Sequence, residues 1–117
     1  MIGIGIDIES IKRFEVLQRD EFQGFLSKIF TEKELEYCFS KKDPAPHLAV
    51  RFCGKEAVLK ALDRPALDYY QVEILNDERG RPEVSILNTK YDVCRFHLSL
   101  SHCDDKAVGF VIVEMLD

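Results

Sequence analysis

The chain begins with a strict alternation of apolar and other residues, which predicts a strand over residues 2–9. One face of this strand carries four isoleucines: Ile2, Ile4, Ile6 and Ile8. The other face carries two glycines and then two carboxylates: Gly3, Gly5, Asp7 and Glu9. The glycines leave room for a neighbouring element, and acids two residues apart can converge on one cation. An exposed edge with Glu9 in solvent is the alternative interpretation.

Helical spacing of apolar residues follows this strand. Ser10 suits the N-cap of a short helix over residues 11–17, and a second short helix is predicted around residues 22–29. Thr31, with Glu34 three residues later, has the pattern of a capping box that opens a third helix. Prolines at 44 and 46 suit the first turn of a long fourth helix that continues to about residue 62.

The period changes to two from residue 71 onwards. Apolar residues at 72, 74, 84 and 86 predict two strands joined by the turn-rich loop 76–82. A last hairpin is predicted from 96–102 and 107–114. Helices in the first half and antiparallel strands in the second predict an α+β fold in which the helices pack on an antiparallel sheet. The length predicts a single domain spanning residues 1–117.

The long helix has a carboxylate and an ammonium where packing favours apolar side chains. Its apolar stripe is formed by Ala45, Leu48, Ala49, Phe52 and Leu59. Glu56 falls inside this stripe and Lys60 lies at its edge. Their i, i+4 spacing suits an ion pair. Because Arg51 and Lys55 flank the same stripe, a phosphate with a divalent cation on the acid fits as well.

Composition limits the kinds of partner that the protein can bind and the cellular compartment that we expect for it. The net charge of -5 argues against a nucleic-acid partner. No apolar run approaches the roughly 18 residues of a membrane span, and the N-terminal segment lacks the basic region of a secretory signal. We therefore expect a cytoplasmic protein that binds no membrane. The cysteines lack C-x-x-C spacing and are predicted to be reduced thiols: Cys38, Cys53, Cys94 and Cys103.

Two further features carry candidate chemistry. Lys12, Arg13 and Arg19 form a basic spot on an acidic chain, which suits docking of an acidic protein, although solvated helix charges give the same pattern. His102 shares a strand face with the apolar residues at 96, 98 and 100. That spacing predicts a histidine at the end of a buried row, and a hydrogen-bonded histidine at the core edge is the default interpretation.

These positions match the signatures of one family. Residues 5–13, Gly-Ile-Asp-Ile-Glu-Ser-Ile-Lys-Arg, resemble the G-x-D-x-x-x-x-x-R signature of phosphopantetheinyl transferases. Residues 51–61, Arg-Phe-Cys-Gly-Lys-Glu-Ala-Val-Leu-Lys-Ala, resemble their R-F-x-x-K-E-A-x-x-K-A signature. Segments 30–35, 76–82 and 97–102 are similar to the small holo-acyl-carrier-protein synthase type. The matches run in order through nearly the whole chain.

The resemblance implies a 4′-phosphopantetheinyl transferase-like fold and the reaction of that family. A serine of an apo acyl carrier protein would attack the β-phosphate of coenzyme A, gain 4′-phosphopantetheine and release adenosine 3′,5′-bisphosphate. A non-catalytic module that binds the carrier or coenzyme A is the main alternative. A different metal-dependent phosphotransferase or hydrolase is the second alternative.

The resemblance also implies roles for individual residues. Asp7 and Glu56 would hold Mg²⁺, and we hypothesise that Glu9 is a third ligand. Lys60 would stabilise the phosphates or accept the serine proton, and we favour the electrostatic role because an ammonium is a poor base. Contacts to the phosphates of coenzyme A are expected from three residues: His102, Lys55 and Arg51.

Partners follow from the same resemblance. Docking of the acidic carrier would fall to the basic first helix and its neighbour: Arg13, Lys12 and Arg19. Small members of the family are homotrimers with active sites between subunits, so we expect a homotrimer.

The chain departs from the family pattern at two places. Where small synthases usually have a Gly-Thr-Gly loop after the lysine helix, this chain has Asp63 and Arg64. Arg64 would take over a phosphate contact, or Asp63 would weaken coenzyme binding. Glu9 is the second departure, because the small type often has a non-acidic residue there.

Overall fold

The computed structural model describes residues 1–116. Its strands are β1 (Ile2–Ser10), β2 (Val72–Asn76), β3 (Pro82–Ile86), β4 (Cys94–Cys103) and β5 (Lys106–Met115). Its α-helices are α1 (Ile11–Leu17), α2 (Gln23–Ile29), α3 (Glu32–Phe39) and α4 (Pro44–Ala61). Short 3₁₀ turns span Asp20–Phe22, Tyr69–Gln71 and Thr89–Tyr91.

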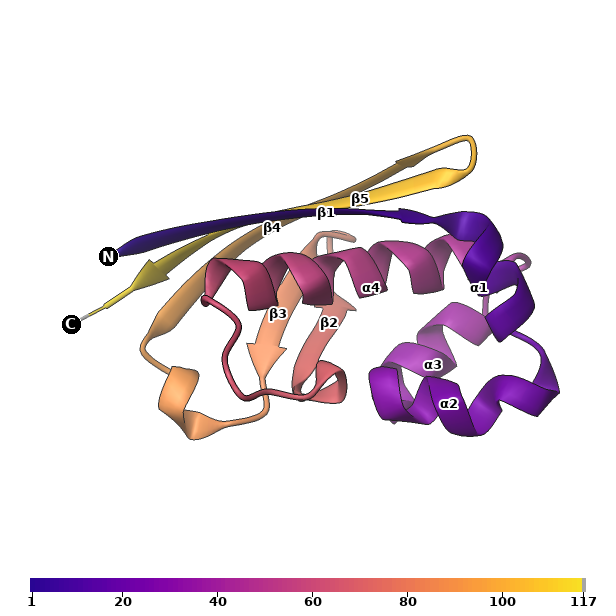
Figure 1. Ribbon diagram of the computed structural model, residues 1–117, viewed down its shortest axis with the longest axis horizontal. Coiled ribbons are helices and arrows are strands. Elements are labelled where there is room, and N and C mark those ends of the chain that lie inside the picture. The colour runs from indigo at the N-terminus through magenta and orange to yellow at the C-terminus, as the bar shows by residue number, and fades with distance from the viewer. Residues whose placement is uncertain (117) are drawn as a thin grey trace.

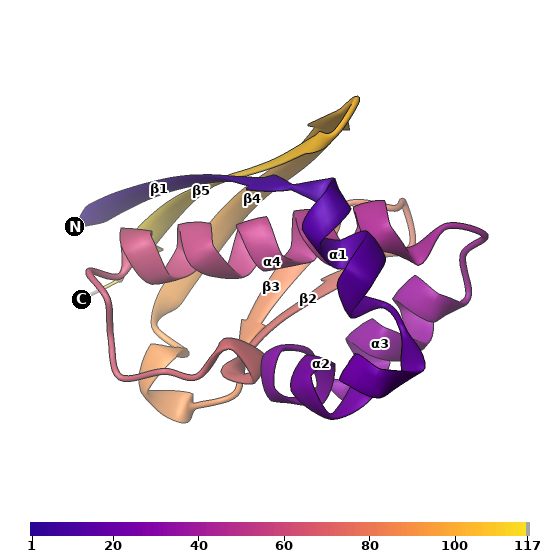
Figure 2. The same cartoon turned by 45° about the vertical axis from the view of Figure 1, so that its right-hand side comes forward.

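The strands form two antiparallel sheets around one helix. The first has the order β1-β5-β4, so the first strand of the chain pairs with the last, and the second is the β2–β3 hairpin. Figures 1 and 2 show α4 beneath the three-stranded sheet, with the hairpin and helices α2 and α3 on its other side. The predicted α+β class is confirmed, although the strands are divided between two sheets.

Helix α4 is buried on nearly every side. Only Pro44, Pro46, His47 and Lys60 of this helix escape burial. The apolar stripe predicted from the sequence is buried, but so is the opposite face, because strands and helices pack all around α4. The helix therefore carries charged side chains into the interior, where each needs a partner.

Two glycines set the distance between β1 and α4. A Cβ atom on Gly3 would overlap the carbonyl oxygen of Ala61, and one on Gly5 would overlap that of Ala57. The sequence-based prediction that another element approaches this face closely is thus confirmed. The isoleucine face of β1 points the other way and is exposed.

The helix starts agree with the predictions, with one difference in how they are capped. Thr31 and Glu34 form both hydrogen bonds of the capping box at the start of α3. Ser10 occupies the N-cap of α1, but its side chain makes no capping bond. The N–H of Ile11 instead donates to the carbonyl of Asp105 at 2.8 Å, which ties α1 to the β4–β5 turn.

Among residues 1–116, none of the helices combines the length and apolar character that a membrane span requires.

The close approach of β1 predicts a large penalty for a methyl group at Gly5. Gly5→Ala should lower the free energy of unfolding by about 3 kcal/mol, because main-chain atoms must move apart. Urea unfolding measures this change. Gly24→Ala is the matched control, since its Cβ would meet no atom within 4 Å. It should stabilise α2 by roughly 0.5–1 kcal/mol. Equal effects at the two glycines would contradict the prediction.

Candidate active site

The carboxyl end of β1 places Asp7 over Lys60 of α4. The Lys60 ammonium donates to Asp7 Oδ1 at 3.1 Å and to the carbonyl of Ile6 at 2.9 Å. The ion pair between Glu56 and Lys60 that the spacing favoured is not formed. The reason is the closeness of β1, since Lys60 reaches the strand more readily than it reaches back along its own helix.

Glu56 is held by two residues that follow α4. The Tyr69 hydroxyl donates to Glu56 Oε1 at 2.5 Å, and Arg64 Nη1 lies 3.4 Å from Oε2. This hydrogen bond to Glu56, together with burial, raises the pKa of Tyr69 to about 12. Tyr69 was not anticipated from the sequence, because a tyrosine in a connecting segment outside every signature carries no periodic or motif signal.

Glu9 is a third acid in the same neighbourhood. Arg13 Nη1 donates to Glu9 Oε1 at 3.0 Å. Burial raises the pKa of Glu9 to about 7, with further upward contributions from the carboxylates of Asp7 and Glu56 and a downward one from Arg13. The influence of both acids on Glu9 indicates that the three carboxylates share one electrostatic environment.

One oxygen of this acidic group has no partner. Asp7 is only 9% exposed, and its Oδ2 atom is buried without a hydrogen bond. Within residues 1–116, no three His, Cys, Asp or Glu side chains are arranged as a ready-made metal cage. Two carboxylates with one free buried oxygen nevertheless fit a hard cation such as Mg²⁺, which commonly uses one or two protein carboxylates and keeps several waters.

The loop after α4 keeps a backbone shape that glycine would adopt easily. Asp63 and Arg64 have φ angles of 59° and 55°, in the left-handed region. For residues with a Cβ atom this conformation costs roughly 1–2 kcal/mol each. The Arg64 amide donates to the carbonyl of Leu59 at 2.8 Å, which closes the helix end. The turn therefore has the backbone conformation that glycine favours, and it places the cation of Arg64 beside Glu56.

Lys55 lies in the interior, away from any site for phosphate. Its ammonium is inaccessible and donates to Glu34 Oε1 at 2.7 Å and to the carbonyls of Tyr69 and Val72. Burial lowers the pKa of Lys55, and Glu34 opposes this shift. Glu34 also accepts from the N–H of Ile74 at 2.8 Å. The predicted phosphate contact of Lys55 is therefore wrong, because three protein oxygens already satisfy its donors.

Arg51 and His102 lie together in a separate pocket. Arg51 is 2% exposed, stacks on the Tyr37 ring at 4.3 Å and donates to Asn76 Oδ1 at 3.2 Å. Its Nε atom is buried without a partner. His102 lines this pocket and is exposed, so it does not end a buried row as the spacing predicted. The row at 96, 98 and 100 is itself only half-buried, because β4 is an edge strand.

The chain is similar to known proteins in both sequence and fold. The family model described as "4'-phosphopantetheinyl transferase superfamily" matches residues 3–111. The chain belongs to the 4′-phosphopantetheinyl transferase superfamily. It is 41% identical over 117 residues to a holo-[acyl-carrier-protein] synthase of Protochlamydia amoebophila, with 95% of this chain and 96% of the relative covered.

Solved structures of this type share the fold. The holo-[acyl-carrier-protein] synthase of Neisseria meningitidis superposes with a TM-score of 0.85 at 35% identity, covering 97% of this chain and 99% of that chain. The enzyme of Bacillus anthracis, in complex with CoA (3',5'-ADP), has a TM-score of 0.83 at 31% identity and covers 97% of this chain and 96% of its own.

The predicted docking residues of this transferase lie on and just after α1. Lys12 is exposed, and Arg13 is half-exposed while its guanidinium lies over the rings of Phe14 and Phe52 at 5.7 and 5.3 Å. Arg19 is exposed beside Glu21 at 3.8 Å. Arg13 thus connects the basic spot to Glu9 and hence to the acidic site.

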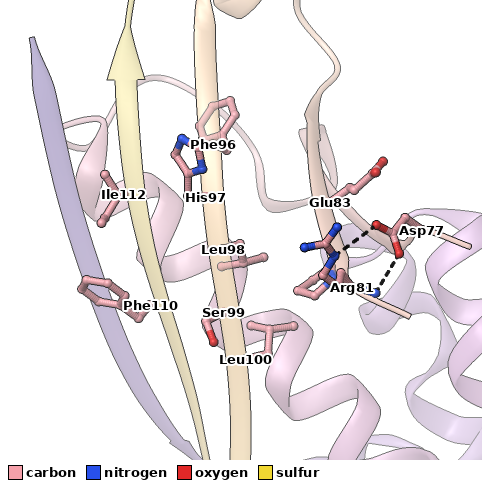
Figure 3. Close-up of a pocket in the computed structure, with 11 residues that line it drawn as sticks. Asp77, Arg81, Glu83, Phe96, His97, Leu98, Ser99, Leu100, Phe110 and Ile112 are labelled. Atoms are coloured by element: carbon pink, nitrogen blue, oxygen red, sulfur yellow. Dashed lines mark hydrogen bonds and ion pairs between the residues drawn. The ribbon is translucent and has the colours of Figure 1, made fainter. Parts of the chain in front are cut away.

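A further hollow lies between the β2–β3 hairpin and β4 (Figure 3). Its lining combines apolar side chains of β4 and β5 with Arg81, which is paired to Asp77. In Figure 3, Leu98 and Leu100 point toward the hairpin. None of Asp7, Glu9 and Glu56 lines this hollow, and we do not assign the chemistry to it.

Proposed function

We propose that this transferase moves 4′-phosphopantetheine from coenzyme A to a serine of an apo acyl carrier protein. The observation that carries the proposal is the ion pair between Asp7 and Lys60, which joins two distant signatures and places Asp7 one helical turn from Glu56 along α4. The complete set of acids and lysine weighs against a non-catalytic binding module. The relatives named above are holo-[acyl-carrier-protein] synthases, in agreement with this assignment.

The reaction requires control of negative charge. The serine hydroxyl loses its proton to a general base such as a water molecule while its oxygen forms a bond to the β-phosphorus of coenzyme A, and the bond from that phosphorus to the bridging oxygen breaks. Charge then grows on the departing adenosine 3′,5′-bisphosphate. The Lys60 ammonium donates to Asp7 and to the carbonyl of Ile6 at this position, and a cation there suits stabilisation of phosphate oxygens.

Asp7 and Glu56 are the proposed ligands of Mg²⁺, with Glu9 as the third. The free Oδ2 atom of Asp7 supports this assignment. When bound, the cation would neutralise charge on the pyrophosphate oxygens. Arg64 would leave Glu56 for a phosphate of coenzyme A, since its side chain is 60% exposed and free to turn.

Arg51 and His102 are the proposed contacts for another phosphate of coenzyme A. Glu56 follows Arg51 by five positions, which places the two residues about 140° apart around α4. The Arg51 pocket contains none of the site acids. Two half-sites on different sides of one helix support an active site completed by a second copy of the chain.

The outer face of the three-stranded sheet supports a homotrimer. The isoleucines of β1 are 59–69% exposed, and Phe110 of the neighbouring strand β5 is 39% exposed. An apolar surface of this kind is typical of protein interfaces. We propose that copies of the chain associate through it, and that the carrier docks at Lys12, Arg13 and Arg19.

The four free cysteines agree with a reducing compartment such as the cytoplasm.

The transfer reaction gives the first prediction. Incubation with apo carrier, coenzyme A and Mg²⁺ should increase the carrier's mass by one phosphopantetheine group. Asp7→Asn and Glu56→Gln should each reduce the rate by at least about 100-fold, because the charge that holds the cation is lost. Asp92→Asn, an exposed acid outside the site, is the control. An unchanged carrier mass would support the binding module, and coenzyme breakdown without transfer would support a hydrolase.

The role of Glu9 gives the second prediction. Glu9→Gln should increase the Mg²⁺ concentration needed for half-maximal transfer by about tenfold, while saturating Mg²⁺ restores the rate. A Mg²⁺ titration of the initial rate measures this change. The same titration curve in the variant and the wild type would exclude Glu9 as a ligand.

The oligomer gives the third prediction. Light scattering should report about three times the 13.5 kDa mass of the chain. Ile4→Glu should yield monomers, because an unpaired carboxylate cannot be buried cheaply in an apolar interface. Val93→Glu, which also replaces an exposed apolar residue but lies outside the sheet, should leave the mass unchanged. A wild-type monomer would rule out the homotrimer.

A further inference from the structure

Tyr69 makes a contact that none of the family signatures accounts for. It opens the 3₁₀ turn Tyr69–Gln71 that leads into β2, and its hydroxyl donates to Glu56 Oε1. We propose that Tyr69 is a positioning residue, which holds the Glu56 carboxylate in the orientation that binds the divalent cation. This inference rests on the proposed function, in which Glu56 is a cation ligand.

The tyrosine is well suited to this task because it is anchored independently of its hydroxyl. Its carbonyl accepts from the buried ammonium of Lys55 at 3.1 Å. Its ring packs against Phe52 with the centroids 5.2 Å apart. The N–H of Asp68 donates to Gln71 Oε1 at 2.9 Å, and the N–H of Gln71 donates to the main-chain carbonyl of Asp68 at 3.0 Å, which closes the turn. The hydroxyl is thus presented to Glu56 by a segment that the core holds in place.

The two partners of Glu56 differ in a way that separates their roles. Arg64 is charged and largely exposed, and its nitrogen lies 3.4 Å from Oε2. A cation bound by Glu56 would repel this guanidinium, so Arg64 is the partner that leaves. The Tyr69 phenol is neutral and occupies one of the two lone pairs of Oε1. The rest of the carboxylate stays available to a metal ion, so Tyr69 can remain in place when the cation binds.

Such a hydrogen bond tunes a metal ligand without touching the metal. Ligating carboxylates are commonly held by hydrogen bonds from a second layer of residues, and loss of these bonds weakens metal binding about 10–100-fold. The bond also restricts rotation of the Glu56 side chain, which reduces the conformational entropy lost on cation binding. Both effects act on the affinity for the cation more than on the chemical step.

Tyr69→Phe tests the proposal, because phenylalanine keeps the ring and the main-chain carbonyl and removes only the hydroxyl. Tyr70→Phe is the matched control. Tyr70 is 43% exposed, and its hydroxyl makes no hydrogen bond within residues 1–116. Binding of Mn²⁺ to each protein is measured by electron paramagnetic resonance without coenzyme A, so that no turnover contributes.

We expect Tyr69→Phe to bind Mn²⁺ about tenfold more weakly than the wild type, with Tyr70→Phe unchanged. The Mg²⁺ concentration for half-maximal transfer should rise in the same proportion, whereas kcat at saturating Mg²⁺ is retained. In a Glu56→Gln background, Tyr69→Phe should have no further effect on Mn²⁺ binding, because the hydroxyl acts through this carboxylate.

Three results would overturn the proposal. They are an unchanged Mn²⁺ affinity in Tyr69→Phe, an equal loss in Tyr70→Phe, and a loss of the same size in the Glu56→Gln background. The comparison of Tyr69→Phe in the wild type and in Glu56→Gln also tests for a general loss of folding. Such a loss would weaken Mn²⁺ binding in both proteins, whereas a local role of Tyr69 would weaken it only in the wild type. Failure of the wild type to modify the carrier would instead count against the proposed function, and the Mn²⁺ comparison would still decide the role of Tyr69.

Discussion

The close contact between β1 and α4 is the constraint on which the rest of the structure depends. Gly3 and Gly5 allow the main chain of the strand to rest against the carbonyls of Ala61 and Ala57. Only at this distance does the Lys60 ammonium reach Asp7 and the strand backbone. The same contact aligns the end of β1 with the middle of α4, where Glu56 lies. Because Gly3 and Gly5 have no side chains, β1 can pack closely on α4, and this packing brings Asp7 of the strand near Lys60 and Glu56 of the helix.

Burial of α4 on nearly all sides has a second consequence. Each charged residue of the helix that enters the interior needs a partner, and the kind of partner distinguishes its role. Lys55 is satisfied by Glu34 and two carbonyls, which connects α3, α4 and β2 and leaves nothing for a ligand. Asp7, from the strand above, retains an oxygen without a donor. Lys55 has thus filled its bonding capacity inside the protein, whereas Asp7 has an oxygen available for a ligand.

The segment after α4 connects the buried Lys55–Glu34 ion pair to the candidate active site. Lys55 holds the carbonyl of Tyr69, and the Tyr69 hydroxyl holds Glu56, so a buried structural ion pair lies one residue away from the candidate catalytic acid. Arg64 approaches the same acid from a turn in the left-handed region, which is strained for a residue with a Cβ atom. Two side chains from the segment after α4, Tyr69 and Arg64, thus contact Glu56. The local stiffness and charge of the site consequently depend on residues outside the family signatures.

The sequence by itself determined the local elements, the α+β class and the identity of the central residues. Period-two and helical spacing, a capping box at Thr31 and two prolines act within a few residues, so they can be read without knowledge of the fold. The signatures likewise identified Asp7, Glu56 and Lys60, and Glu56 also stands out because it lies inside an apolar stripe. What remained open were contacts between segments far apart in the chain.

Only the tertiary structure decided which charges pair. The sequence could not show that Lys60 bonds to Asp7 and not to Glu56, that Lys55 is enclosed, or that His102 is exposed. It also contained no sign of Tyr69. The physical reason is that a long side chain can reach several partners, and the choice among them is made by the distance between backbones. Here Gly3 and Gly5 set the distance between the backbones of β1 and α4.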